Sequence, residues 1–186
     1  MATKRQKQPK RFLKEVILVI CEGNTESAYI DFLRKSYHSP IRIISQVEGQ
    51  KISQKLIDKH EESLKIDKCD KVTTFLMYDM DVEAVNQRIN QCKATFLLSN
   101  PCFEFWLLLH HSKVTTPLDT DAVIRKLKAS DSVWQQYTKG TLTFSQQNYL
   151  WQNKDKAISH AKDLSLYSHP SSSVYLLLER LEKTIK

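Results

Sequence analysis

The apolar part of the chain opens with an uninterrupted aliphatic run, Val-Ile-Leu-Val-Ile-Cys, at positions 16–21. A strand with one face in water alternates apolar and polar side chains, and this run does not. Such a run is typical of a parallel strand that helices cover on both faces. The 186 residues include only three glycines and five prolines, which argues against an all-β fold with many tight turns. We therefore expect one α/β domain with a substantial core.

Four segments of the first half have the composition of strands. They are rich in aliphatic and β-branched residues, and short polar connections separate them from the segments that follow. The predicted strands are Glu15–Cys21, Ile41–Ile44, Val72–Tyr78 and Ala94–Leu98.

A helical pattern follows each predicted strand, which makes a small, mainly parallel, Rossmann-like sheet flanked by helices the expected architecture. Asn24 or Thr25 is expected to cap the first helix, because both side chains accept hydrogen bonds from free N–H groups. Asn100 is expected to cap the fourth, with Pro101 at its first helical position. The helices are expected near Ala28–Leu33, Ile52–Leu64 and Val82–Cys92, and after Asn100-Pro101.

The second half has no further strand pattern. We expect it to form a C-terminal helical cap, so that residues 15–186 make a single domain with an α/β core at 15–111 and a helical part at 112–186. The turn Ser168–Ser173 is expected to lead into the last helix. The helices of this half are predicted at Leu118–Leu127, Leu150–Leu164 and Val174–Ile185.

Residues 1–14 form a basic arm without acidic residues, within a chain of formal net charge +7. Such an arm binds polyphosphate through counterion release, or it only keeps the chain soluble, and the sequence leaves both readings open. Its basic residues are Lys4, Arg5, Lys7, Lys10, Arg11 and Lys14.

Composition also narrows the cellular setting. No apolar run is long enough for a membrane helix, and the N-terminus lacks the apolar core of a secretory signal, so we expect a cytoplasmic protein without a membrane partner. The cysteines show no C-x-x-C pairing, which predicts reduced, mostly buried thiols rather than a zinc site or a disulfide framework. The four cysteines are Cys21, Cys69, Cys92 and Cys102.

Acidic residues follow two of the predicted strands directly. Glu22 comes after the first strand, and Asp79 and Asp81 come after the third. Ligands of open parallel sheets bind at the carboxyl ends of the strands, where crowded carboxylates repel one another unless a cation or protons neutralise them. We therefore predict that these three hold Mg²⁺, with Mn²⁺ as a substitute. Taken alone, Asp-x-Asp also occurs in solvated turns and helix caps.

Three more residues are candidates for the same site. Glu26, in the segment Glu22-Gly23-Asn-Thr-Glu26, is either an additional acid of the site or a favourable charge at a helix start. Glu104 lies between aromatic residues and is expected to be an active-site acid or to pair with Lys139, with a simple charge at a helix start as the alternative. Lys139 suits the negative charge of a phosphodiester transition state, although a solvated lysine is an equal alternative.

For the remaining candidates, the sequence favours structural roles. His110 and His111 stand at the end of an apolar helix, where a histidine suits the helix dipole; a proton carrier or phosphate contact is the alternative. Trp106, Trp134 and Trp151 are expected in the core rather than stacked on bases.

Several segments together resemble the RloB-like family, and Ser99–Glu104 (Ser-Asn-Pro-Cys-Phe-Glu) is the most specific of them. The resemblance runs from about Glu15 to the C-terminus. One departure is His169, where the family is expected to have Asn. The segments are Ile20–Glu26, Tyr78–Asp81, Ser99–His110, Tyr137–Lys139, Ala157–Ala161 and Pro170–Val174.

The resemblance implies a toprim-like fold and function. In toprim enzymes a glutamate after the first strand acts as general acid or base and an Asp-x-Asp motif binds Mg²⁺, which implies these roles for Glu22, Asp79 and Asp81. It further implies a nuclease effector of a bacterial anti-phage (abortive infection) system that works with an ABC-type ATPase.

The sequence thus predicts a Mg²⁺-dependent nuclease that cleaves DNA or RNA. The main alternative is a non-catalytic module that binds nucleic acid or nucleotide in the same acidic crevice. Phosphoryl transfer on a small molecule, with Asp79 as nucleophile, is a third possibility. The sequence leaves open the choice between DNA and RNA, the number of metal ions and whether the chain forms a homo-oligomer.

Overall fold

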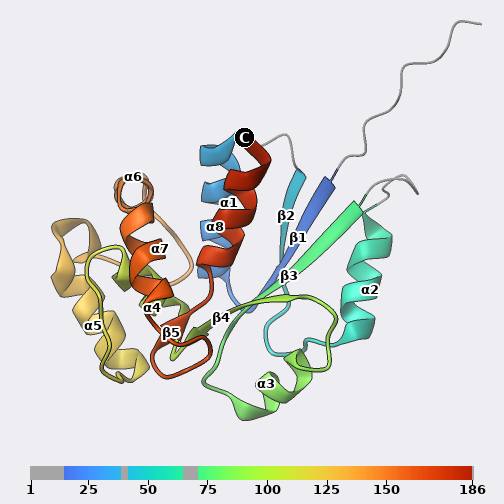
Figure 1. Ribbon diagram of the computed structural model, residues 1–186, viewed down its shortest axis with the longest axis horizontal. Coiled ribbons are helices and arrows are strands. Elements are labelled where there is room, and N and C mark those ends of the chain that lie inside the picture. The colour runs from blue at the N-terminus through green and yellow to red at the C-terminus, as the bar shows by residue number, and fades with distance from the viewer. Residues whose placement is uncertain (1–14, 39–41, 65–70, 186) are drawn as a thin grey trace, which may run out of the picture.

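The computed structural model describes residues 15–38, 42–64 and 71–185. The predicted basic arm and Cys69 lie outside the described residues. Within them, the α/β class predicted from the aliphatic run is confirmed (Figure 1).

One sheet of five strands organises the molecule, in the order β2-β1-β3-β4-β5. The first four strands are parallel, and β5 runs antiparallel to β4 at the edge. This agrees with the predicted mainly parallel sheet, although β5 has no counterpart in the sequence prediction. The strands are β1 (Glu15–Cys21), β2 (Arg42–Val47), β3 (Lys71–Asp79), β4 (Thr95–Asn100) and β5 (Ser171–Ser172).

The central position of β1 explains its composition. It pairs with β2 on one side and β3 on the other, and Cys21 at its end lies opposite Val47 and Met77. Its side chains from Val16 to Cys21 are at most 3% exposed, because helices cover both faces. The aliphatic run therefore fills two cores at once, which is why it does not alternate.

Helices cover each face of the sheet. On one face α2 (Gln54–Ser63) and α3 (Glu83–Ile89) pack on the even-numbered side chains of β1. On the other, α1 (Asn24–Tyr37) and α8 (Tyr175–Ile185) pack on the odd-numbered ones (Figure 1). Because β1 and β3 are parallel neighbours, their carboxyl ends lie at the same edge of the sheet.

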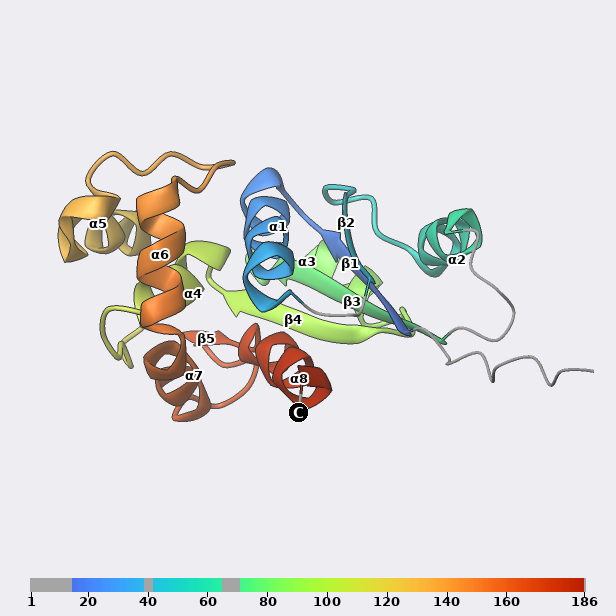
Figure 2. The same ribbon diagram turned by 90° about the horizontal axis from the view of Figure 1, so that it is seen from above.

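The remaining helices gather beside α1, beyond the β4–β5 side of the sheet (Figure 2). Helix α4 is buried along its whole length and packs against α5 and α7. Trp106 in α4 and Trp134 in the short helix η1 are fully buried, as expected for core residues. The elements are α4 (Phe103–Leu109), α5 (Thr120–Ser130), η1 (Ser132–Trp134), α6 (Phe144–Gln152) and α7 (Lys154–Lys162).

Two further element predictions are wrong. Asn100 does not cap a helix: it is the last residue of β4 and pairs with Ser171, and α4 starts after Cys102 instead. The predicted single helix from Leu150 to Leu164 is two helices, α6 and α7, that meet at Asn153. At Asn100 the local pattern favoured a helix, and the pairing with Ser171 keeps this residue in a strand instead.

Two predictions from composition have structural counterparts. Cys21, Cys92 and Cys102 carry free, buried thiols. Among the described residues, no helix has the length and apolar character needed to cross a membrane.

Candidate active site

A cavity of about 400 Å³ opens at the carboxyl ends of β1 and β3. It brings together all six side chains singled out in the sequence, from four separate stretches of the chain. Within the described residues its lining carries five carboxyl groups and one lysine. The lining residues are Glu22, Gly23, Asn24, Thr25, Glu26, Asp79, Asp81, Glu104, Lys139 and Gly140.

Glu22 directly follows β1, and backbone contacts to β3 fix its position. Its N–H donates to the carbonyl of Met77 (3.0 Å), which extends the β1–β3 pairing by one residue. Its carboxylate accepts a hydrogen bond of 3.1 Å from the backbone N–H of Asp79. Burial raises the pKa of Glu22, and the hydrogen bond from Asp79 opposes that shift. Glu22 is thus held against the end of the neighbouring strand.

Asp79 is the last residue of β3 and lines the cavity beside Glu22. Its Oδ1 atom is buried, with no hydrogen-bond partner among the residues that the structure describes. Burial raises the pKa of the Asp79 carboxyl to about 9, and the other carboxyl groups of the cavity add to the shift, led by Glu26 and Glu22. Asp81, two residues on, is exposed at the rim of the cavity.

Glu26 and Gly23 explain how α1 begins. The helix starts at Asn24 after an extended Gly23 without a side-chain cap, so the predicted capping by Asn24 or Thr25 is wrong. A Cβ at position 23 would lie 3.0 Å from Oε2 of Glu26, so glycine makes room for this carboxylate. Burial raises the pKa of Glu26 to about 7, while a hydrogen bond from its own backbone N–H opposes the shift. Glu26 therefore belongs both to the helix start and to the acidic cavity.

Glu104 differs from the other acids because the protein supplies its partners. Its side chain is 1% exposed, and Oε1 accepts a hydrogen bond of 2.9 Å from the hydroxyl of Tyr137. Its Oε2 makes no hydrogen bond among the described residues but lies 3.4 Å from Nζ of Lys139, so the expected pairing of these two residues is present as an ion pair. Burial alone would lower the pKa of Lys139, but Glu104 outweighs it and raises that pKa.

A tether that the sequence did not reveal holds Lys139 in place. The N–H of Gly140 donates to Oγ1 of Thr25 (2.8 Å), which joins the segment after η1 to the first turn of α1. Gly140 has φ +94°, a conformation that glycine adopts easily and other residues rarely do. The only local hint was the family segment around Tyr137, and no spacing rule connects Thr25 to a residue so far along the chain.

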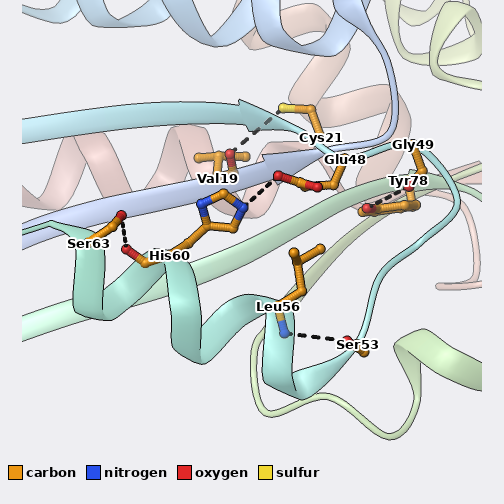
Figure 3. Close-up of polar contacts among 9 residues, drawn as sticks. All are labelled: Val19, Cys21, Glu48, Gly49, Ser53, Leu56, His60, Ser63 and Tyr78. Carbon is orange, nitrogen blue, oxygen red and sulfur yellow. Dashed lines mark hydrogen bonds and ion pairs between the residues drawn. The ribbon is translucent and has the colours of Figure 1, made fainter.

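The turn between β2 and α2 borders the end of β3 (Figure 3). The hydroxyl of Tyr78 donates to the carbonyl of Gly49 (3.0 Å). Nε2 of His60 lies 2.6 Å from Oε1 of Glu48. These contacts fix the turn beside the residue that precedes Asp79, which adds rigidity to that side of the site.

His110 and His111 do not line the cavity. His110 is fully buried, its Nδ1 lies 3.0 Å from the carbonyl of Trp106, and burial lowers its pKa to about 4. His111 is exposed, and its Nδ1 lies 3.1 Å from the hydroxyl of Tyr149. The structural reading of both histidines agrees with these positions.

The donor set suits a hard divalent cation, although it is not closed around one point. Carboxylate oxygens are the ligands that Mg²⁺ prefers, and the unpartnered Oδ1 of Asp79 is an acceptor with nothing to accept from. Across the ranges that the structure describes, however, no three His, Cys, Asp or Glu side chains lie close enough to hold a metal ion. Mg²⁺ keeps several water ligands and needs only one or two carboxylates, so the cavity fits it without a complete protein cage.

Comparison with known proteins gives one result. The family model described as RloB-like protein matches residues 17–181. No curated protein and no solved structure matches the chain. The match covers β1 to α8 and includes every residue of the cavity lining.

Proposed function

This chain belongs to the RloB-like family, and from that premise we propose that it is a Mg²⁺-dependent nuclease that hydrolyses phosphodiester bonds of DNA or RNA. As the family resemblance implies, it acts as the effector of a bacterial anti-phage system together with an ABC-type ATPase. Mn²⁺ is expected to replace Mg²⁺.

One observation carries the proposal: the crowding of uncompensated carboxyl groups at the ends of β1 and β3. A cavity with five carboxyl groups and one lysine repels a phosphodiester as long as the acids are ionised. Protons or cations can neutralise the acids, but only bound cations give the cavity the positive charge that attracts a phosphate. Burial, and after it repulsion from the neighbouring carboxyl groups, raises the pKa of Asp79 to about 9.

Each residue has a proposed role that follows from its position in the cavity. Asp79 and Asp81 would hold the cation, with Glu22 as a further ligand or as the group that takes the proton from the attacking water. The bond from the Asp79 N–H orients Glu22 for either role. Lys139, held by Glu104 and exposed on its other side, is placed to neutralise charge that develops on the phosphoryl oxygens. When bound, Mg²⁺ would polarise a phosphoryl oxygen and activate water.

The test is cleavage of mixed DNA and RNA oligonucleotides by the purified chain, alone and with its ATPase, in Mg²⁺, Mn²⁺, Ca²⁺ or chelator. We expect cleavage with Mg²⁺ and Mn²⁺, and binding with little turnover in Ca²⁺. Glu22→Gln is expected to reduce the rate about 10²- to 10⁴-fold, as for loss of a proton-transfer group. Glu62→Gln, an exposed glutamate of α2, is the matched control and should cleave like the wild type.

The rival function is a regulatory module that binds nucleotide or nucleic acid without cleaving it. It is favoured by the finding that no three potential ligands among the described residues enclose a metal position. Under this alternative the wild type binds oligonucleotides in Mg²⁺ but leaves them intact even with the ATPase present. Equal cleavage by folded Glu22→Gln would instead remove the assigned role of that residue.

A further inference from the structure

Phe144 is the first residue of α6, and its side chain is 75% exposed. This is the largest exposed fraction among the large hydrophobic residues that the structure describes. Single exposed apolar side chains are common and usually need no explanation. Phe144 differs from them in two respects. Its backbone is held rigidly, and the same segment of the chain includes Lys139 and Gly140, which line the cavity.

The start of α6 is fixed by a reciprocal pair of hydrogen bonds. The N–H of Gln146 donates to the hydroxyl of Thr143 (3.3 Å), and the N–H of Thr143 donates to the side chain of Gln146 (2.9 Å). Gln146 is buried, and its Nε2 donates to the carbonyl of Val133 (3.0 Å). The ring of Phe144 therefore stands on a backbone with little freedom, so ordering it on a ligand costs little entropy.

The same segment leads from the candidate active site. Gly140 is tied to Thr25 at the start of α1, with Lys139 beside it in the cavity lining. Phe144 follows Gly140 by four residues, so the two are at most about 14 Å apart along the chain. Helices α1 and α6 begin on the same side of the molecule, and the segment that leads from η1 into α6 reaches toward the start of α1 (Figure 2).

The acidic cavity by itself offers a nucleic acid little binding energy, so affinity must come from contacts around it. We infer that Phe144 is a stacking platform for an unpaired nucleobase next to the scissile phosphate, which makes single-stranded nucleic acid the substrate class. The inference rests on the proposed nuclease function and names its substrate. Stacking on an aromatic ring needs no positive charge and tolerates any base.

The experiment measures binding of a fluorescent single-stranded oligonucleotide to the full chain, with Ca²⁺ in place of Mg²⁺ to prevent turnover. Phe144→Ala should weaken binding about 5- to 100-fold, and Phe144→Trp should restore it. Leu166→Ala, which removes an apolar side chain that is 47% exposed in another loop, is the control and should bind like the wild type. Because Phe144 is exposed, its removal should leave the melting temperature unchanged.

Oligonucleotides with single abasic positions identify the stacked base. One abasic position should weaken wild-type binding as much as Phe144→Ala does, and should have no further effect in that variant. Equal affinity of wild type and Phe144→Ala overturns the inference, as does absence of oligonucleotide binding by the wild type. A Phe144→Ala defect only in binding the ATPase also overturns it and assigns the ring to a protein contact.

The two proposals fail separately. Cleavage by the wild type together with unchanged affinity of Phe144→Ala removes the stacking platform and leaves the nuclease. Phe144-dependent binding by a wild type that never cleaves removes the nuclease and leaves a single-strand binding surface.

Discussion

Glu104 and Asp79 line the same cavity, but their carboxyl groups have different surroundings. Glu104 is almost completely buried, yet it has a hydroxyl from Tyr137 and the ammonium group of Lys139 as partners. Oδ1 of Asp79 and Oε2 of Glu104 are both buried without a hydrogen bond among the described residues, but Oε2 of Glu104 has Nζ of Lys139 at 3.4 Å, and Asp79 has no ion pair there. Proteins rarely leave buried polar atoms unsatisfied, and such exceptions concentrate at functional sites. Glu104 with Tyr137 and Lys139 is therefore a completed wall of the cavity, and Asp79 is an incomplete one, for which we propose Mg²⁺ as the partner.

The largest expected effect concerns the incomplete wall in the absence of metal. The pKa of Asp79 is about 9 in the folded protein and ordinarily near 4 in an unfolded chain. Because the folded value is the higher one, the contribution of Asp79 to the stability of the metal-free protein is fully present below about pH 4 and is lost as the pH rises toward 9. Relative to Asp79→Asn, we expect the wild type to lose about 2 to 4 kcal/mol over this range, less than the full shift because the cavity is open.

Urea unfolding in chelator across this pH range measures the difference. Asp121→Asn, at an exposed position of α5, is the control and should follow the wild-type curve. If the free energy of unfolding depended on pH in the same way in wild type and Asp79→Asn, the proposed difference between Asp79 and Glu104 would be wrong.

A smaller effect is expected on the completed wall. Tyr137→Phe removes the hydroxyl that donates to Glu104 and leaves a buried carboxylate oxygen without that donor. We expect a loss of about 1 to 3 kcal/mol in the free energy of unfolding. Tyr149→Phe is the matched control, because its hydroxyl contacts only the exposed His111 in the described hydrogen bonds, and it should cost less than about 0.5 kcal/mol. Equal costs would mean that the fold does not depend on the pairing of Glu104.

The smallest effect concerns the hydrogen bond from Gly140 to Thr25, which holds the segment that carries Lys139. Thr25→Val removes the acceptor of the Gly140 N–H and should cost about 1 kcal/mol, whereas Thr25→Ser keeps the hydroxyl and should restore stability. The measurement is the melting temperature of the two variants, with hydrogen exchange at Gly140. Unchanged exchange at that N–H in Thr25→Val would show that other contacts hold Lys139.

The sequence predicted the sheet best where composition alone determines the environment. The aliphatic run of β1 has one low-energy location, between two helical layers, and its predicted bounds agree with the structure. The two serines of β5 carry no strand preference, and only their pairing with Ser99 and Asn100 makes them a strand. The same pairing keeps Asn100 extended, so a good local capping pattern lost to a contact about 70 residues away.

For the candidate site, the sequence predicted which residues lie together better than it predicted the contacts between them. Placement at strand ends was enough to expect Glu22 and Asp79 in one crevice, because parallel strands end at the same edge. The pairing of Glu104 with Lys139 was one of the alternatives that the sequence left open, and it is present. The role of Thr25 was not predictable, because it depends on a loop that returns from the helical part.

The measurement that tests the central claim most directly is isothermal titration calorimetry of Mg²⁺ into wild type, Asp79→Asn and Tyr137→Phe, in two buffers of different ionisation enthalpy. The account predicts one binding event in the wild type and in Tyr137→Phe, with release of protons from the incomplete wall, and its loss in Asp79→Asn. Equal Mg²⁺ binding by wild type and Asp79→Asn, or no binding by the folded wild type, would contradict it.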